Sequence, residues 1–248
     1  MRKGNCMTVN KTARASALLL GATLALGGAS LASAEMKDDA IMTRFMLDRF
    51  EVRSQDGDDL LSWEAQINAR TDYQGMAFKT SGERPHNGPT ESAEHQLLYQ
   101  RLVSEFFDAQ FGIRHDNQPG PSRTYAVAGL QGLAPYWFEV DANLFLSDEG
   151  DASARIEAEY DLLLTQRLVL QPSAELTVAF SDDEDIGVGS GLSSAEVGIR
   201  LRYEISRKFA PYVGVNWEKS FGDTADFARA EGEDAEVGSL VIGVSAWF

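Results

Sequence analysis

The sequence predicts an all-β protein, a transmembrane antiparallel β-barrel of the outer-membrane type with about twelve strands. Three observations lead to this prediction. Apolar and polar residues alternate with a period of two along almost the whole chain after residue 34. The N-terminus has the pattern of an export signal. The last strand ends on Trp247 and Phe248, and outer-membrane barrels end in a similar strand whose terminal Phe is read by the assembly machinery.

Residues 1–34 read as a secretory signal peptide. Basic residues precede an apolar run at 15–26, and small residues ending in Ala32-Ser33-Ala34 form a cleavage site. The apolar run is too short to cross a bilayer as an anchor. The expected organisation is therefore a signal peptide at 1–34 and an outer-membrane β-barrel at 35–248, located in the outer membrane of a Gram-negative cell.

The alternating segments have to be distinguished from those of a soluble β-sandwich, in which one face of each sheet is also polar. Arginine and glutamate are closely mixed on the polar face, as in Arg200, Arg202 and Glu204. Such mixing favours a narrow polar lumen with paired charges over a water-exposed sheet face. Eight charged residues are expected to face the lumen: Glu139, Asp141, Arg155, Glu157, Glu159, Arg200, Arg202 and Glu204.

The spacing of the alternating segments predicts twelve strands, an even number of about the length that a tilted membrane strand needs. They are expected at 41–53, 60–69, 74–83, 94–103, 108–116, 123–132, 136–146, 153–161, 167–180, 194–205, 211–220 and 237–248. Compact connections alternate with acidic ones, and all the acidic runs fall on one side of the barrel, which would be the cell exterior. Pro172, inside a predicted strand, requires a bulge or an unpaired position for its missing N–H.

Composition excludes some partners. The formal net charge is −16 over 248 residues, and the charged residues of the signal peptide are all basic, so the remainder is more acidic still. This balance argues against nucleic acid as a partner. The single cysteine, Cys6, lies in the signal peptide, so no disulfide is expected in the exported chain.

Three long segments and one short one resemble the copper resistance protein B family. They are "GIRHDNQPGPSRTYAVAGLQGLAPYWFEVDA" (112–142), "ARIEAEYDLLLTQRLVLQPSAEL" (154–176), "VGIRLRYEISRKFAPYVGVNWEKSFGDTADFAR" (197–229) and "LDRFEVRSQDG" (47–57). The resemblance implies an outer-membrane barrel of a copper-resistance operon, which binds or exports copper alongside a periplasmic multicopper oxidase. Family members often carry a Met- and His-rich segment before the barrel. Here only residues 35–40 stand in that place, which implies low copper capacity.

The expected copper ligands follow from the preference of Cu(I) for thioethers and imidazoles. Met42 and Met46 share a face of the first strand, and Asp48 and Glu51 would assist from the lumen if the strand has a bulge near Arg49. His115 is expected near the opposite rim, pointing outward by parity. These residues would be successive copper-binding positions along a route rather than one site. Ordinary packing is the alternative role for the methionines.

The expected function is that of an outer-membrane barrel in a copper-resistance system, which binds copper and aids its sequestration or export. Its partners would be copper ions, outer-membrane lipid and a periplasmic multicopper oxidase, and no catalytic residue is expected. Two alternatives remain open at this point. One is an outer-membrane lipid hydrolase, which needs a serine matching an outward His115. The other is a small passive channel or structural barrel.

Overall fold

The computed structural model describes residues 40–55, 59–118 and 120–248, and the predicted signal peptide lies outside them. All described residues belong to one compact unit. The described chain contains twelve long strands: β1 (Met42–Ser54), β2 (Leu60–Arg70), β3 (Gln74–Pro85), β4 (Ser92–Leu102), β5 (Phe107–Gln118), β6 (Arg123–Ala134), β7 (Phe138–Ser147), β8 (Ala152–Glu159), β10 (Leu168–Ala179), β11 (Gly191–Tyr203), β12 (Phe209–Ser220) and β13 (Glu236–Trp247). Each lies within three residues of its predicted position. The remaining elements are β9 (Leu162–Leu163), η1 (Pro135–Trp137), η2 (Glu184–Ile186) and α1 (Gly222–Glu231).

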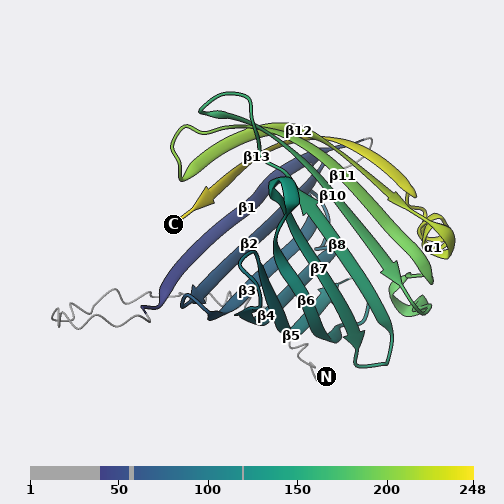
Figure 1. The fold of residues 1–248 in the computed structure, drawn as a ribbon. Helices are drawn as coiled ribbons and strands as arrows, with labels where there is room; N and C mark the ends of the chain where they lie inside the picture. Colours follow the sequence, from purple (N-terminus) through teal and green to yellow (C-terminus); the bar gives the residue numbers. More distant parts are fainter. Residues whose placement is uncertain (1–39, 56–58, 119) are drawn as a thin grey trace, which may run out of the picture. The chain divides into compact units, whose positions relative to one another are not determined.

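The strands form a closed antiparallel barrel (Figure 1). Each long strand pairs with its neighbours in sequence, and β13 closes the ring by pairing with β1. The chain end takes part in this seam, because Phe45 and Phe248 exchange both backbone hydrogen bonds, at 3.0 and 2.9 Å. The predicted twelve-stranded barrel is therefore confirmed, and the sandwich is excluded.

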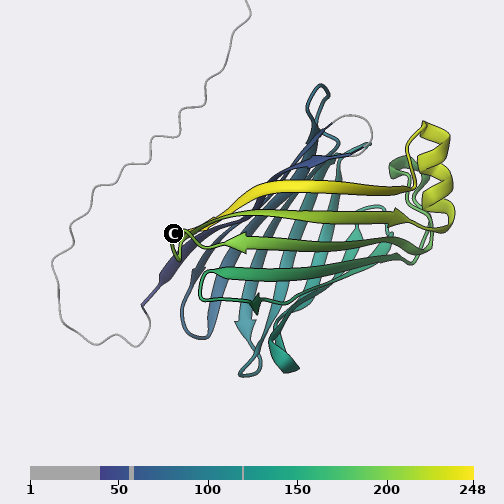
Figure 2. The same cartoon turned by 90° about the horizontal axis from the view of Figure 1, so that it is seen from above.

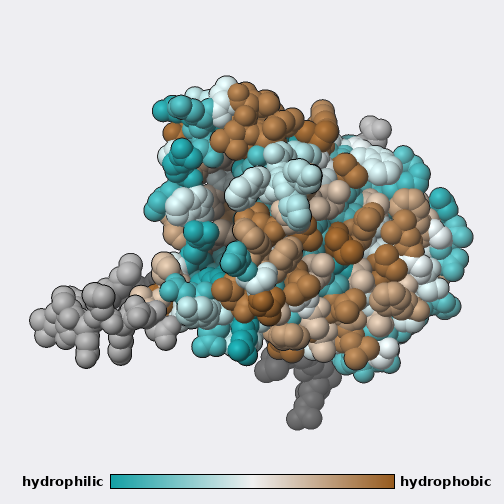
Figure 3. Space-filling model, viewed as in Figure 1, coloured by the Kyte–Doolittle hydropathy of each residue, from teal (hydrophilic) through white to brown (hydrophobic). Residues whose placement is uncertain are grey.

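Polarity is inverted relative to a soluble protein. Outward-facing apolar side chains stay exposed, for example Leu240 at 65% and Ile242 at 68%, whereas Glu51 and Arg200 are each 1% exposed inside. Figure 3 shows apolar residues gathered over the outward faces of the strands. An apolar outer wall around a polar interior is what a bilayer requires of a barrel. None of the helices among the described residues is long and apolar enough to cross a membrane.

The connections divide between two rims. Those that follow β1, β3, β5, β7, β10 and β12 form the long-loop rim, where α1 lies, and the others form the short-turn rim with the C-terminus (Figure 2). Exposed aromatic side chains crowd the short-turn rim: Tyr73, Phe106, Tyr136, Trp137 and Phe248. Such residues favour the membrane–water boundary. The helix α1 was not predicted, since an acidic loop was expected there.

The hydrogen-bond ladder between β8 and β10 explains why a proline is tolerated at position 172. Strand β8 ends at Glu159, and pairing with β10 resumes only at β9, opposite Val169 and Leu170. The carbonyl of Pro172 accepts a hydrogen bond of 3.1 Å from the Tyr160 N–H, so the nitrogen of Pro172 faces the same interruption. The missing N–H therefore falls where the ladder is broken, as the sequence required.

At the long-loop rim, Arg123 holds the connection between β10 and β11 in place. Its guanidinium is buried and donates to both carboxylate oxygens of Asp183, at 3.2 and 3.1 Å. Asp185 lies 3.4 Å away, and Glu149, from the connection after β7, also pairs with this guanidinium. In the same loop the backbone N–H of Ser190 donates to Asp182, which lowers the pKa of that carboxyl. Arg123 thus joins two loops at the barrel mouth.

Replacing Arg123 with alanine should release this loop. Each hydrogen bond to a charged group contributes about 1.5–3 kcal/mol, so cleavage by an Asp-specific protease between residues 180 and 190 should accelerate by tenfold or more. Peptide mapping of samples taken at successive times measures the cleavage rate. Arg229→Ala, which removes only an exposed pair with Asp226 on α1, is the control. Equal cleavage rates in both variants would contradict the role of Arg123.

Candidate functional site

The first strand carries a bulge that turns two consecutive charged side chains into the lumen. Its pairing register shifts between Leu47 and Phe50 against β13, and between Leu47 and Arg49 against β2. Asp48 therefore accepts a hydrogen bond of 3.3 Å from the lumen residue Gln66, while Arg49 also points inward. The predicted bulge near Arg49 is confirmed, and it concentrates charge on this strand.

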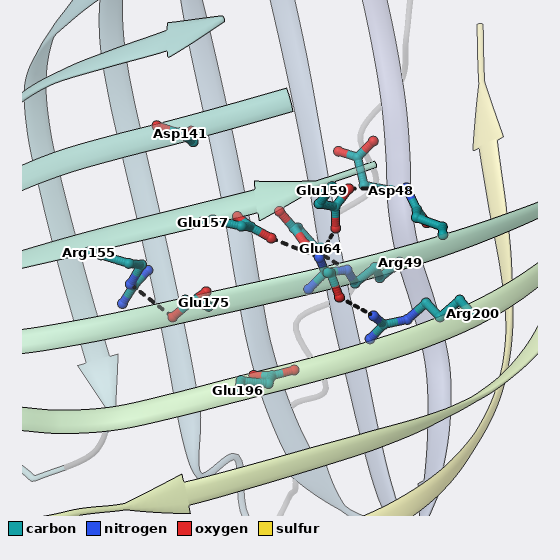
Figure 4. A network of polar contacts seen from close by, with 12 residues as sticks. Asp48, Arg49, Glu64, Asp141, Arg155, Glu157, Glu159, Glu175, Glu196 and Arg200 are labelled. Carbon is teal, nitrogen blue, oxygen red and sulfur yellow. Dashed lines mark hydrogen bonds and ion pairs between the residues drawn. The ribbon is translucent and has the colours of Figure 1, made fainter. Parts of the chain in front are cut away.

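Arg49 reaches across the lumen from β1 to β8 (Figure 4). Its guanidinium pairs with Glu157 at 2.8 Å and with Glu159, and it also lies 3.5 Å from Glu64 on β2. Strands β1 and β8 are not neighbours in the barrel. The contact therefore bridges the bore, and we call these four residues the Arg49 cluster.

A second group, the Glu51 cluster, is fully buried and comprises Glu51, Arg53, Arg200 and Tyr212. One oxygen of Glu51 accepts from Arg53 Nε and Arg200 Nη2, both at 2.9 Å. The other accepts from Arg200 Nε at 3.0 Å and from the Tyr212 hydroxyl at 2.9 Å. Four charge-assisted donors saturate this carboxylate. Its placement indicates a structural role, so Glu51 is left out of the ligand set proposed below.

Further ion pairs lie elsewhere in the lumen. Glu94 lies between Arg114 at 2.8 Å and Arg155 at 3.1 Å, and Lys79 pairs with Asp141 at 2.6 Å. Together with the pairs Arg70–Asp108 and Arg202–Asp161, eight cationic side chains share twelve carboxylates across the described lumen. The excess of carboxylates makes the interior attractive to cations.

The predicted lumen face is largely confirmed. Arg155, Glu157, Glu159, Arg200 and Asp141 all take part in the lumen ion pairs. Arg202 pairs with Asp161 at 2.6 Å near the short-turn rim, and Glu139 shares the parity of Asp141 on β7. Glu204 lies one residue beyond β11, where strand parity no longer decides which way a side chain points.

A cavity of about 270 Å³ opens inside the barrel at the short-turn rim, and Met46 lines it. Its other walls include the amides of Gln66, Asn68 and Gln100. The Oδ1 atom of Asn68 is buried and has no hydrogen-bond partner among the described residues. The cavity therefore combines a thioether with amide groups and with the charged side chains of Arg70, Glu105 and Asp108.

The five predicted metal ligands do not converge. Met42 is 64% exposed at the start of β1, and Met46 lies four positions further along the strand, about 13 Å away. Asp48 lies about 7 Å beyond Met46 on the lumen side, whereas His115 is exposed on the outward face of β5. Among the described residues, no group of three or more His, Cys, Asp or Glu side chains is arranged to hold a metal ion.

Sequence reasoning missed two features. Arg49 was not assigned to the lumen, although consecutive charges at 48 and 49 in an alternating strand were the available signal. His95 was not connected with His115, although the strand register pairs them directly. Only the register of β4 against β5 reveals that contact.

The fold and the lumen define an outer-membrane β-barrel whose bore is crossed by ion pairs. The structure resembles the porin NanC with a TM-score of 0.54 at 11% identity, over 82% of this chain and 98% of that chain, which shows the shared fold alone. The family model described as copper resistance protein B precursor (CopB) matches residues 41–248. A copper resistance protein B homolog from Pseudomonas syringae pv. tomato is 44% identical over 86% of this chain and 72% of its own length. Copper resistance protein B from Escherichia coli is 43% identical over 85% and 71%. The chain belongs to the copper resistance protein B family.

Proposed function

We propose that this barrel binds copper in the outer membrane and aids its sequestration or export as part of a copper-resistance system. The observation that carries the proposal is Met46, a thioether from a family-like strand, lining a cavity at the short-turn rim. Thioethers are preferred ligands of Cu(I). Short turns of outer-membrane barrels face the periplasm, so this cavity would receive copper from the periplasmic side.

The positions of these residues along β1 suggest a sequence of copper-binding positions. Met42, exposed at the rim, is the first thioether that a periplasmic donor such as a multicopper oxidase would meet. Met46 follows about 13 Å further along the strand, and Asp48 leads to the carboxylate-rich lumen. Copper is the cargo in this proposal, and its low capacity follows from the few thioethers available.

The ion pairs that cross the bore count against the passive-channel alternative. Arg49 and Arg53 each connect strands that are not neighbours, through Glu157 and Glu196 respectively. Free diffusion of sizeable solutes would have to displace these buried pairs. The absence of enzymatic activity stays a prediction, as does the alternative of a lipid hydrolase.

The test is a Cu(I) titration of the detergent-purified barrel against a competing chelator. Met42→Leu/Met46→Leu should lower the Cu(I) affinity by at least about tenfold, because removing even a group that only orients a metal ligand has an effect of that size. Met46→Leu alone should account for most of this loss. The matched control is Met76→Leu, because Met76 is 45% exposed on the outward face of β3. Identical Cu(I) uptake by the double variant and the wild type would show that both methionines only pack.

A further inference from the structure

Two histidines meet on the outward face of the barrel, away from the lumen. His95 on β4 and His115 on β5 are direct cross-strand partners. They share the outward parity of Leu97 and Ile113, which are 45% and 54% exposed. Side chains of directly opposed residues have Cβ atoms about 4.5–5.5 Å apart. We call these two residues the histidine pair.

A threonine holds each imidazole from the strand on its far side. The Thr80 hydroxyl on β3 lies 3.0 Å from His95 Nδ1, and the Thr124 hydroxyl on β6 lies 3.0 Å from His115 Nδ1. The four residues form one row across β3–β6, since Thr80 opposes His95 and His115 opposes Thr124. The row is symmetric about the histidine pair.

This arrangement leaves the Nε2 atoms available. Neither Nε2 has a hydrogen-bond partner among the described residues. The Nδ1 atom and the Cδ2–Nε2 edge lie on opposite sides of an imidazole ring. Each ring that places Nδ1 against its threonine therefore turns its Nε2 edge toward the other histidine. The Phe78 ring, stacked on His95 at 6.3 Å and 9°, further restricts that ring.

We propose that the histidine pair is a two-imidazole site for a divalent transition-metal ion, and that it binds Cu(II) most tightly. Imidazole suits copper and zinc, and Cu(II) stands at the top of the affinity order for such donors. Metal-bound histidines usually donate their second N–H to an orienting acceptor, and the hydroxyls of Thr80 and Thr124 occupy that place. Binding needs both Nε2 atoms unprotonated, and water completes the coordination.

The position of the pair admits a hydrated ion. Both histidines lie three residues from the long-loop ends of their strands, His95 after Ser92 and His115 before Gln118. The apolar side chains of Leu97 and Ile113 lie on the other side of the pair, toward the middle of the strands. The pair thus sits at the border of the apolar band. It lies toward the opposite rim from the Met46 cavity, so this site does not depend on the function proposed for the lumen.

Cu(II) titration of the untagged, detergent-purified barrel, followed by electron paramagnetic resonance, tests the site. The expected spectrum shows nitrogen couplings from two imidazoles at one bound ion. His95→Gln and His115→Gln should each remove this two-imidazole signal. Thr80→Val, which keeps both ligands, should weaken Cu(II) binding by about 10–100-fold.

The chain offers a matched control in His86→Gln, because the sequence has three histidines and His86 lies in the connection after β3. This variant should bind Cu(II) like the wild type. Heat-modifiable gel mobility confirms that each variant is folded. A wild-type spectrum without imidazole coupling, or one unchanged in both ligand variants, would overturn the proposal. The Met42→Leu/Met46→Leu variant should keep the Cu(II) signal while its Cu(I) affinity falls, so either proposal can fail without the other.

Discussion

Replacing Glu51 with alanine is expected to destabilise the barrel by about 3–5 kcal/mol, the cost of leaving buried charges without their partner. The substitution removes the acceptor of four hydrogen bonds from Arg53, Arg200 and Tyr212. Among the residues that the structure describes, Arg200, which is 1% exposed, would then keep only a 3.2 Å bond to Ser173. Urea unfolding in detergent, followed by tryptophan fluorescence, measures the loss.

Two further variants separate the causes of that effect. Glu51→Leu combined with Arg200→Met removes both charges and should recover much of the lost stability, because an apolar pair can replace a buried ion pair. Arg229→Ala removes an exposed pair with Asp226 on α1 and should shift the unfolding midpoint little. If Glu51→Ala unfolds at the wild-type urea concentration, the Glu51 cluster does not stabilise the barrel.

Replacing Arg49 with alanine should open the lumen to cations. The side chain connects β1 to Glu157 and Glu159 on β8 and partly neutralises Glu64. Its removal takes away the bridge across the bore and leaves these carboxylates without their cation. Carboxylates that line a confined path raise the local cation concentration, so cation conductance in planar bilayers should rise by about tenfold.

Reversal potentials in a salt gradient give the selectivity of this path. The Arg49→Ala barrel should favour K⁺ over Cl⁻ more strongly than the wild type does. Arg229→Ala, on α1 at the long-loop rim, should leave both conductance and selectivity unchanged. An Arg49→Ala barrel that conducts no better than the wild type would show that other residues close the bore.

The proposed copper sites differ in their chemistry and lie toward opposite rims of the barrel. Met46 offers a thioether in a cavity at the short-turn rim, which suits Cu(I). The histidine pair offers imidazoles toward the long-loop rim, on the outward face, which suits Cu(II). Between them lies a lumen with more carboxylates than cations, and Arg49 is the side chain that most directly bridges it.

The sequence by itself determined the barrel, its strands and its family. A period of two is a local property of each strand. The inward orientation of Arg155 or Arg200 could therefore be predicted without knowing which strands lie beside its own. The change of parity between Asp48 and Glu51, both expected in the lumen, required a bulge near Arg49, and Pro172 required an unpaired position. Both were found, because the chemistry of a single strand imposes them.

Only the tertiary structure decided which of these side chains meet. Arg49 pairs with glutamates 108 and 110 residues away, and that contact depends on how the closed barrel places β1 against β8. Similarly, His95 faces His115 only in the observed register of β4 and β5, since a slip of one residue would turn one imidazole inward. Strand register and the contacts made across the bore are collective properties of the whole sheet. No local pattern encodes them, and for that reason the inward-facing charged residues were predictable while their partners were not.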